Sequence, residues 1–269
     1  MAESLQMQVQ GDASAPRLVY LPGLHGDWHY NAGLRDALKG HVQLVELAYP
    51  REPSWKLEDY VQAIEAALLA AGFREGWLLG ESFGSQVAWG MIGRAETQRA
   101  AGQPHFQPKG LILAGGFVRY PLMWGVRLVR GTHQSLPMAA VAALLRGYLR
   151  LLRWRHRQAP HVRQSLQAHQ DFQLQELARQ AILSRYDIIL AHDHRPLAQR
   201  TTLPVFYLTG FWDLIVPWFL VQPWLRRHCP GYRGWRLVWN SEHNILGFQP
   251  RTSASQILAW LKANGEPVL

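Results

Sequence analysis

Cysteine is nearly absent from this 269-residue sequence, in which Cys229 is the single example. An internal disulfide and a cysteine-based metal site are therefore excluded, and a reducing cytoplasm is the expected compartment. The longest uninterrupted apolar runs, such as Met138 to Leu145, fall far short of the roughly 20 residues that a membrane-spanning helix needs. No N-terminal stretch combines a basic flank, an apolar run and a small-residue cleavage site, so no signal peptide is expected.

Acidic residues are scarce relative to basic ones, with 19 Asp and Glu against 28 Lys and Arg, which gives a formal net charge of +9. Such a balance is typical of proteins that bind nucleic acid, an anionic membrane surface or an acidic ligand, and also of proteins with only a solvated basic surface. No recognised nucleic-acid-binding motif accompanies the charge, so no nucleic-acid partner is expected. Part of the positive charge lies on one predicted helical face, formed by Arg146, Arg150, Arg153 and Arg157. That face is either solvated or in peripheral contact with an anionic membrane.

The sequence also lacks repeats, low-complexity tracts and Ser/Gly-rich linkers, while 48% of its residues are apolar. Short apolar runs alternate with helical patterns, which predicts parallel βαβ units around a sheet that is buried on both faces. A helix is expected to begin near Pro53, with Ser54 as its N-cap. The predicted strands are Arg17–Leu21, Val42–Leu47, Trp77–Leu79, Leu111–Ala114, Pro204–Leu208 and Trp235–Trp239.

Residues 117–200 contain no convincing strand and are instead typical of several helices rich in Arg, Gln and Leu. We therefore predict an α/β fold in which residues 1–116 and 201–269 form the core. Residues 117–200 are predicted to be a helical cap inserted over one end of the sheet.

The motif Gly80-Glu81-Ser82-Phe83-Gly84 follows a predicted strand and precedes a predicted helix. A serine on a sharp strand-to-helix turn exposes its hydroxyl above the sheet, and the flanking glycines permit the strained turn. The helix N-terminus that follows directs its amides and positive dipole end toward a developing oxyanion. Ser82 is therefore a candidate nucleophile, and the alternative is a serine that merely occupies a tight turn.

A serine hydroxyl needs a base to take its proton, and that base needs an orienting acid. In proteins whose nucleophile lies on such a strand-to-helix turn, the three residues follow one another along the chain in the order serine, acid, histidine. Asp213 lies in the loop just past one later predicted strand, and His243 lies just past the next. Both requirements are met in order. Asp187 is an alternative acid, but it does not follow a strand.

With these residues the sequence resembles the α/β-hydrolase superfamily over nearly the whole chain outside the insertion. The Gly-Glu-Ser-Phe-Gly turn, the G-x-x-D-x-x-V-P run at 210–217 and the Glu-His pair at 242–243 carry the resemblance. It implies an α/β-hydrolase fold with a mostly parallel central sheet. It also implies Ser82 as nucleophile, His243 as general base and then acid, and Asp213 as the group that orients the imidazole.

Two backbone amides are expected to form an oxyanion hole. One is the amide of Phe83, the residue after the nucleophile. The loop after Arg17–Leu21 supplies the other, and its similarity to the Leu-Pro-Gly-Leu variant of the superfamily favours Leu24, with His25 as the alternative.

Three side chains near the expected site are candidates for the substrate pocket: His25, Glu81 and Trp212. His25 is alternatively a polar loop residue. Glu81 is alternatively a hydrogen-bonding residue behind the nucleophile, or a residue of the strand-to-helix turn that faces solvent or bonds to the backbone. His192-Asp193-His194 superficially suggests a metal cluster, but residues one and two apart on a helix do not face each other. We expect no metal site and no cofactor.

The expected function is that of a cytoplasmic serine hydrolase that cleaves an ester or thioester of a small or medium apolar substrate through an acyl-enzyme. Carbon–carbon bond or lactone hydrolysis by the same triad is one alternative. Another is a non-catalytic binding protein of the same fold with a basic, membrane- or anion-contacting cap. The sequence does not indicate an oligomeric state.

Overall fold

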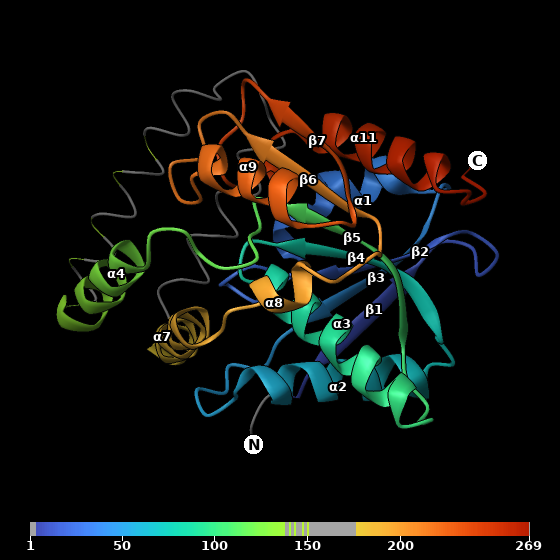
Figure 1. Ribbon diagram of the computed structural model, residues 1–269. Coiled ribbons are helices and arrows are strands. Elements are labelled where there is room, and N and C mark those ends of the chain that lie inside the picture. Colours follow the sequence, from blue (N-terminus) through green and yellow to red (C-terminus); the bar gives the residue numbers. More distant parts are fainter. Residues whose placement is uncertain are drawn as a thin grey trace.

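The computed structural model describes residues 4–137, the single positions 140, 143, 147 and 150, and residues 176–268. Within these residues, seven strands form one sheet in the order β1-β3-β2-β4-β5-β6-β7 (Figure 1). Strand β1 pairs antiparallel with β3, and every other pair is parallel. The strands are β1 (Gln6–Gln10), β2 (Arg17–Leu21), β3 (Gln43–Ala48), β4 (Glu75–Glu81), β5 (Gln107–Ala114), β6 (Val205–Gly210) and β7 (Tyr232–Val238).

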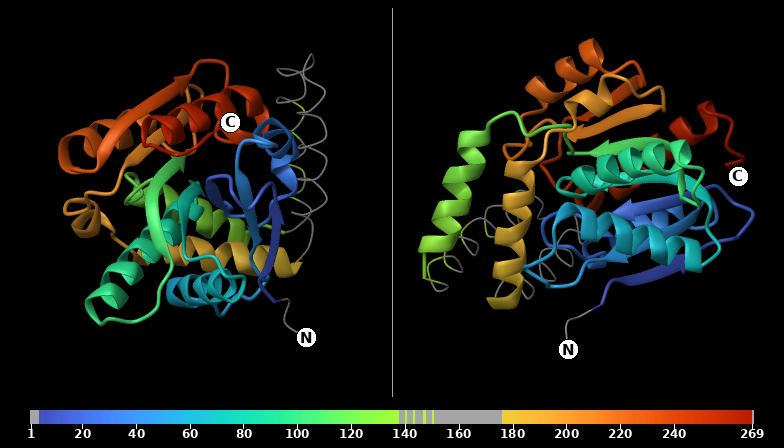
Figure 2. Two further views of the ribbon diagram at one scale, coloured as in Figure 1. Left: turned by 90° about the vertical axis from the view of Figure 1, so that its right-hand side faces the viewer. Right: turned by 60° about the horizontal axis from the view of Figure 1, so that its bottom comes forward.

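Helices cover both faces of the sheet (Figures 1 and 2). One face carries α1 (Ala32–Leu38), which follows the 3-10 turn η1 (His29–Asn31), together with α10 (Ile245–Phe248) and α11 (Pro250–Ala263). The other face carries α2 (Leu57–Ala70), α3 (Gly84–Ala100) and α9 (Trp218–His228).

Three further described helices lie between β5 and β6 in the chain. They are α4 (Met123–Ser135), α7 (Glu176–Ala191) and α8 (Arg195–Ala198). Helices α4 and α7 pack side by side beyond one end of the sheet (Figure 2). No helix of the described residues is long and apolar enough to cross a membrane.

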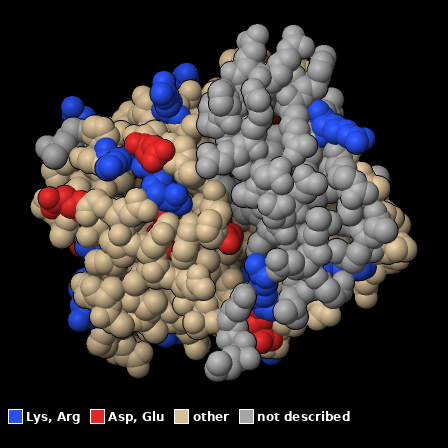
Figure 3. All heavy atoms as spheres, turned by 180° about the vertical axis from the view of Figure 1, so that it is seen from behind, with Lys and Arg blue, Asp and Glu red and all other residues tan. Residues whose placement is uncertain are grey.

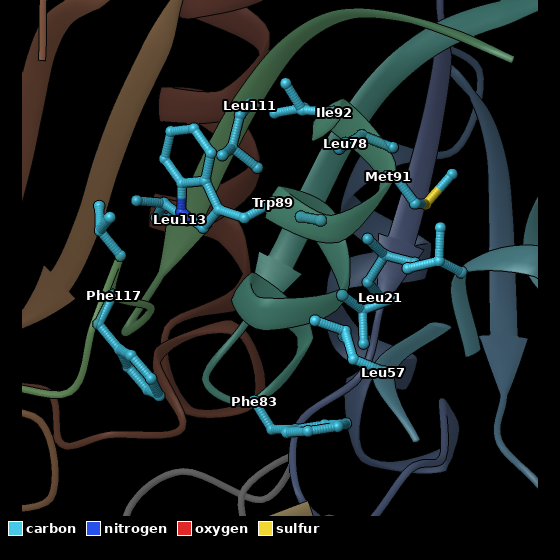
Figure 4. Packing of buried hydrophobic residues seen from close by; sticks show 14 of the residues in the cluster. Leu21, Leu57, Leu78, Phe83, Trp89, Met91, Ile92, Leu111, Leu113 and Phe117 are labelled. Atoms are coloured by element: carbon cyan, nitrogen blue, oxygen red, sulfur yellow. The ribbon is translucent and has the colours of Figure 1, made fainter. Parts of the chain in front are cut away.

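The core explains why the central strands are nearly continuous apolar runs. Successive side chains of a strand point to opposite faces, and here both faces are covered by helices. Leu78 accordingly packs toward α3, whereas Leu79 packs toward α1 and α11, and both are fully buried. Figure 4 shows Leu78, Leu111 and Leu113 from the strands around Trp89 of α3.

The structure confirms the predicted α/β class and places each predicted strand within one or two residues of its observed position, apart from the longer starts of β4, β5 and β7. It adds the antiparallel edge strand β1, whose half-exposed sequence QMQVQ gives little apolar signal.

The predicted N-cap at Ser54 is wrong, because α2 begins at Leu57 and its N-cap is Lys56. The amide and hydroxyl of Ser54 both donate to the carboxylate of Glu52, which closes a separate turn. Asp59 accepts the backbone N–H of Lys56, so the helix is capped two residues later than predicted.

The strand order of the sheet reverses at β2. The chain leaves β2 for β3 on one side and then returns to β4 on the other side. Loops at the carboxyl ends of neighbouring strands diverge at such a reversal, and ligands bind there in open α/β sheets. The loop after β2 and the turn after β4 meet at this point.

Gly110 of β5 is expected to be intolerant of a side chain, because an added Cβ would overlap the ring of Trp77 on the neighbouring strand. Overpacking of this kind costs about 1–3 kcal/mol. Gly110→Ala should therefore lower the Tm by several degrees in thermal unfolding, at roughly 2–4 °C per kcal/mol.

Gly131→Ala is the matched control, because an added Cβ in helix α4 meets nothing within 4 Å. It should leave the Tm unchanged or raise it slightly. Equal Tm values for the two variants would contradict the packing argument.

Candidate active site

Ser82 occupies a strained turn between β4 and α3. Its φ of 49° makes it the one non-glycine residue with positive φ among the described residues. This conformation costs an ordinary residue roughly 1–2 kcal/mol. Surrounding hydrogen bonds hold it, since the Ser82 amide donates to the Ala114 carbonyl over 3.0 Å and the Ser85 hydroxyl donates to the Ser82 carbonyl over 2.6 Å.

The second glycine of the motif is required by a close approach of backbone. A Cβ on Gly84 would overlap the carbonyl oxygen of Leu21, at the end of β2. Glycine therefore lets the first turn of α3 pack directly on β2. The consequence is that the loop after β2 lies against the serine: a Cβ on Gly23 would stand 3.5 Å from the Cβ of Ser82.

Asp213 and His243 come from loops that follow β6 and β7. The distance from His243 Nε2 to Ser82 Oγ is 2.9 Å, and the distance from His243 Nδ1 to Asp213 Oδ2 is 2.8 Å. The second carboxylate oxygen of Asp213 accepts the amides of Ile215 and Val216 at 3.0 and 2.8 Å. The three predicted residues thus form one continuous hydrogen-bonded line, and the acid is fixed by its own loop.

The electrostatics of the site favour a basic imidazole. Burial lowers the pKa of His243, but the charge and hydrogen bond of Asp213, together with the charge of Glu81, outweigh this effect and raise the pKa above its ordinary value. Each carboxylate acts by stabilising the imidazolium form. The arrangement can therefore accept a proton from the Ser82 hydroxyl and hold the resulting charge.

Comparison with known proteins identifies the architecture of the chain. No protein-family model and no curated protein matches the sequence. A hydrolase from Pseudomonas aeruginosa PA01 is similar in structure, with a TM-score of 0.75 and 17% identity over 96% of this chain and 94% of that one. An enol-lactonase from Burkholderia xenovorans LB400 gives a TM-score of 0.73 and 18% identity over 96% of both chains. A thermophilic esterase from Thermogutta terrifontis gives a TM-score of 0.71 and 17% identity over 97% of this chain and 93% of that one.

The chain has the α/β-hydrolase fold. Its mostly parallel seven-stranded sheet, covered by helices on both faces, is the part of the structure that this likeness concerns.

The loop that follows β2 in this α/β-hydrolase fold contains both candidate oxyanion donors other than Phe83. Residues 23–26 form a turn closed by a hydrogen bond from the Gly26 amide to the Gly23 carbonyl, 2.9 Å long. The Leu24 and His25 amides belong to this turn. Because Gly23 lies against Ser82, the turn lies next to the serine. The assignment of either amide as an oxyanion donor stays a prediction.

The candidate pocket residues occupy different environments. The Glu81 carboxyl is buried and accepts the hydroxyl of Tyr20, so it lies behind the serine in the interior, and burial raises its pKa. The His25 ring lies beside Gly23. Trp212 is half-exposed next to Asp213, with its ring edge-on to Phe211. Glu81 therefore acts on His243 through its charge, while the other two lie nearer the surface.

Tyr120 belongs to the site and was not predicted from the sequence. It follows β5, and its hydroxyl donates to the carbonyl of Ile215 in the Asp213 loop. Burial raises the pKa of Tyr120 to about 12, with a further contribution from the charge of Asp213. It carried no recognisable signal, because only the pairing of β5 with β6 brings it to this loop.

The remaining charged residues of interest are engaged elsewhere or lie outside the described part. Asp187 pairs with Arg130 of α4, and Asp193 pairs with Arg119 and Arg195. No group of three His, Cys, Asp or Glu among the described residues could hold a metal ion.

Three arginines of the predicted basic face lie outside the described residues, at positions 146, 153 and 157. The fourth, Arg150, is exposed on a helix. On the face seen in Figure 3, Lys and Arg are dispersed over the described surface with acidic residues among them.

The pKa of His243 should respond to both carboxylates. Removal of the Asp213 charge in Asp213→Asn leaves only the charge of Glu81 to oppose the effect of burial, so the pKa of His243 should fall. Glu81→Gln keeps an acceptor for Tyr20 and should lower the pKa by a smaller amount. NMR titration of the His243 ring, assigned with His243→Ala, measures both shifts.

Glu96→Gln is the control, because Glu96 pairs with Arg200 on the surface of α3 and should leave the His243 titration unchanged. An unchanged or raised pKa in Asp213→Asn would contradict the electrostatic account.

Proposed function

We propose that this protein is a serine hydrolase that cleaves carboxylic esters or thioesters through an acyl-enzyme. The observation that carries the proposal is the hydrogen-bonded line from Ser82 through His243 to Asp213, which begins at a strained turn. A binding protein has no need of a serine that is both strained and bonded to a basic imidazole.

In the proposed reaction, Ser82 Oγ attacks the substrate carbonyl carbon while His243 Nε2 removes the hydroxyl proton. The carbonyl π electrons move to oxygen, and the resulting oxyanion is bound by the Phe83 amide and by an amide of the loop after β2. Collapse of the tetrahedral intermediate breaks the bond to the leaving group, which takes the proton from His243. Water then attacks the acyl-enzyme with His243 as base, and Ser82 is regenerated.

Each oxyanion donor would contribute about 3 kcal/mol of transition-state stabilisation. Helix α3 begins at Gly84, and the dipole at its N-terminus favours negative charge at the same place. Asp213 retains its charge throughout and holds His243 in the tautomer that has Nε2 free to accept a proton.

Apolar side chains around the site support an apolar substrate. Leu214, Ile215 and Phe219 are 90%, 49% and 58% exposed, and the first two follow Asp213 directly. A cavity of about 470 Å³ lies beside Tyr120, whose hydroxyl reaches the Asp213 loop. Its lining is mostly apolar and includes Met123, Leu220, Val221 and Trp224.

We propose that residues 117–200 form the inserted cap that shapes this region. Helix α4 follows β5 and supplies Met123 to the cavity, while α8 supplies Arg195. Tyr120 at the start of the insertion connects it to the acid loop. The insertion would therefore contribute to the choice of substrate.

Lactone hydrolysis is a second candidate that uses the same steps, because a lactone is an internal ester. The enol-lactonase similarity favours including it, although at 18% identity that likeness concerns the fold.

A fluorophosphonate serine probe tests the nucleophile directly. The wild-type protein should be labelled stoichiometrically and Ser82→Ala should not be labelled, because the probe forms a covalent bond only with an activated serine. Ser14→Ala is the control, since Ser14 is exposed and bonds only locally to Asp12. Labelling of Ser82→Ala at the wild-type rate, or none of wild type, would refute the proposal in favour of a non-catalytic protein.

A panel of p-nitrophenyl esters tests the substrate class. If the acyl chain enters an apolar site, kcat/KM should rise from acetyl to hexanoyl by up to about fourfold per methylene, which corresponds to about 0.8 kcal/mol for each buried group. Matched thioesters and a lactone complete the panel. A profile that is flat or falls with chain length would contradict an apolar acyl site.

A further inference from the structure

Arg185 of α7 is a buried charged residue that the proposed reaction does not use. Its side chain is 1% exposed, and it is among the largest fully buried side chains of the described residues. Burial of an unpaired charge costs several kcal/mol unless polar groups compensate it. The polar groups that Arg185 contacts are therefore the ones that compensate its buried charge.

Those contacts lie on the loop beside Ser82, on the loop after β3 and on α2. Nη1 donates to the Leu24 carbonyl over 2.6 Å and Nη2 donates to the Pro50 carbonyl over 3.1 Å. Nε donates to the Tyr60 hydroxyl over 3.2 Å. The guanidinium also lies 5.4 Å from the ring centroid of Tyr49, within range of a cation–π interaction. One side chain thus joins α7 to the loops after β2 and β3 and to α2.

Gly26 shows how closely the guanidinium is pressed against the turn at residues 23–26. Its φ is +74°, and a Cβ there would stand 2.6 Å from Nη1 of Arg185. The Gly26 amide closes the turn on Gly23, and its carbonyl accepts the Tyr49 amide at 2.8 Å. The turn is therefore held on one side by backbone and on the other by Arg185.

Because the peptide bond is planar, these contacts also determine the directions in which the candidate oxyanion donors point. A carbonyl oxygen and the N–H of the next residue belong to one rigid unit and point in opposite directions. The Gly23 carbonyl, held by Gly26, fixes the direction of the Leu24 amide. The Leu24 carbonyl, held by Arg185, fixes the direction of the His25 amide.

We propose that Arg185 is a positioning residue for the oxyanion hole, which it orients by holding the Leu24 carbonyl and packing on Gly26. The proposal rests on the hydrolase function proposed above, and it applies whether Leu24 or His25 supplies the donor. It also connects α7, a helix of the inserted segment, to the reacting centre. Figures 1 and 2 show α7 beside the N-terminal end of α2, where Ser184 donates to the Trp55 carbonyl.

Lysine cannot replace arginine in this role. The planar guanidinium supplies donors in fixed directions to two carbonyls and a hydroxyl at once, whereas an ammonium group is a single point. Arg185→Lys therefore keeps the charge and loses the geometry.

The test compares full-length Arg185→Lys and Gly26→Ala with wild type on the best ester of the panel. Loss of one aligned oxyanion donor lowers kcat by roughly 10²–10³-fold. Both variants should show a fall in kcat of at least 10-fold with KM changed less than threefold. The binding of a trifluoromethyl ketone, which forms an oxyanion adduct with serine, should weaken in parallel with kcat. The His243 titration should stay at its wild-type pKa.

Arg179→Lys is the matched control, because Arg179 lies on the same helix and donates to the carbonyls of His133, Gln134 and Leu136 at the end of α4. It should retain kcat within twofold. Assays are run well below each variant's Tm, and Gly26→Ala retains the Arg185 side chain if the lysine variant folds poorly.

The outcomes separate the two proposals. Wild type that neither reacts with the fluorophosphonate nor hydrolyses any ester overturns the hydrolase function, and the role of Arg185 with it. An active wild type with kcat and ketone affinity unchanged in Arg185→Lys and Gly26→Ala overturns the positioning role alone. A fall in kcat that Arg179→Lys reproduces would also overturn it, because the effect would then be a general loss of helix packing.

Discussion

The contact between the first turn of α3 and the end of β2 is the constraint on which the site depends. It forces Ser82 into a left-handed conformation, and it exists because Gly84 has no Cβ to overlap the Leu21 carbonyl. The strain is of the order of 1–2 kcal/mol, which is at most the net contribution of two or three hydrogen bonds to stability. The bonds from Ser82 to Ala114 and from Ser85 to Ser82 are of the right number to offset it. With this contact in place, the serine hydroxyl and the loop after β2 are adjacent.

Strand β5 contributes none of Ser82, Asp213 or His243, yet it makes their meeting possible. It lies between β4, which precedes the serine, and β6 and β7, which precede the acid and the histidine. The chain leaves β5 through Gly115 and Gly116. A Cβ on Gly115 would stand 3.1 Å from His243 Nδ1, and one on Gly116 would stand 2.8 Å from the Ser85 Cβ. The glycine pair gives the space through which side chains from distant strands reach the serine.

The sequence was sufficient to predict features that depend on local chain order. Ser82, Asp213 and His243 each follow a strand with a clear apolar pattern, and their order along the chain was the decisive cue. The N-cap at Ser54 was predicted wrongly, because Ser54 donates its amide and hydroxyl to Glu52 in a separate turn and the helix begins only at Leu57, which a residue pattern does not reveal.

Contacts between distant segments could not be predicted. Tyr120 reaches the acid loop across β5 and β6, and the carboxyl of Glu81 meets Tyr20 across β4 and β2. Arg185 lies 161 residues from its partner Leu24. Nothing in the neighbouring sequence of Arg185 distinguishes it from the other arginines of the insertion, since its burial results from the way α7 packs against α2.

The three buried charges near the site are compensated in different ways, and the difference bears on the proposed chemistry. Asp213 is held by two amides and His243, and Glu81 is held by Tyr20, so both negative charges lie on the side of the imidazole. Arg185 is held among the described residues by neutral oxygens, so its positive charge is not cancelled there and lies on the loop after β2. Serine attack on a carbonyl creates an imidazolium and an oxyanion together. In the proposed reaction, a fixed negative field on the first side and a positive field on the second would stabilise that separation in a region of low dielectric, without any reorganisation of solvent.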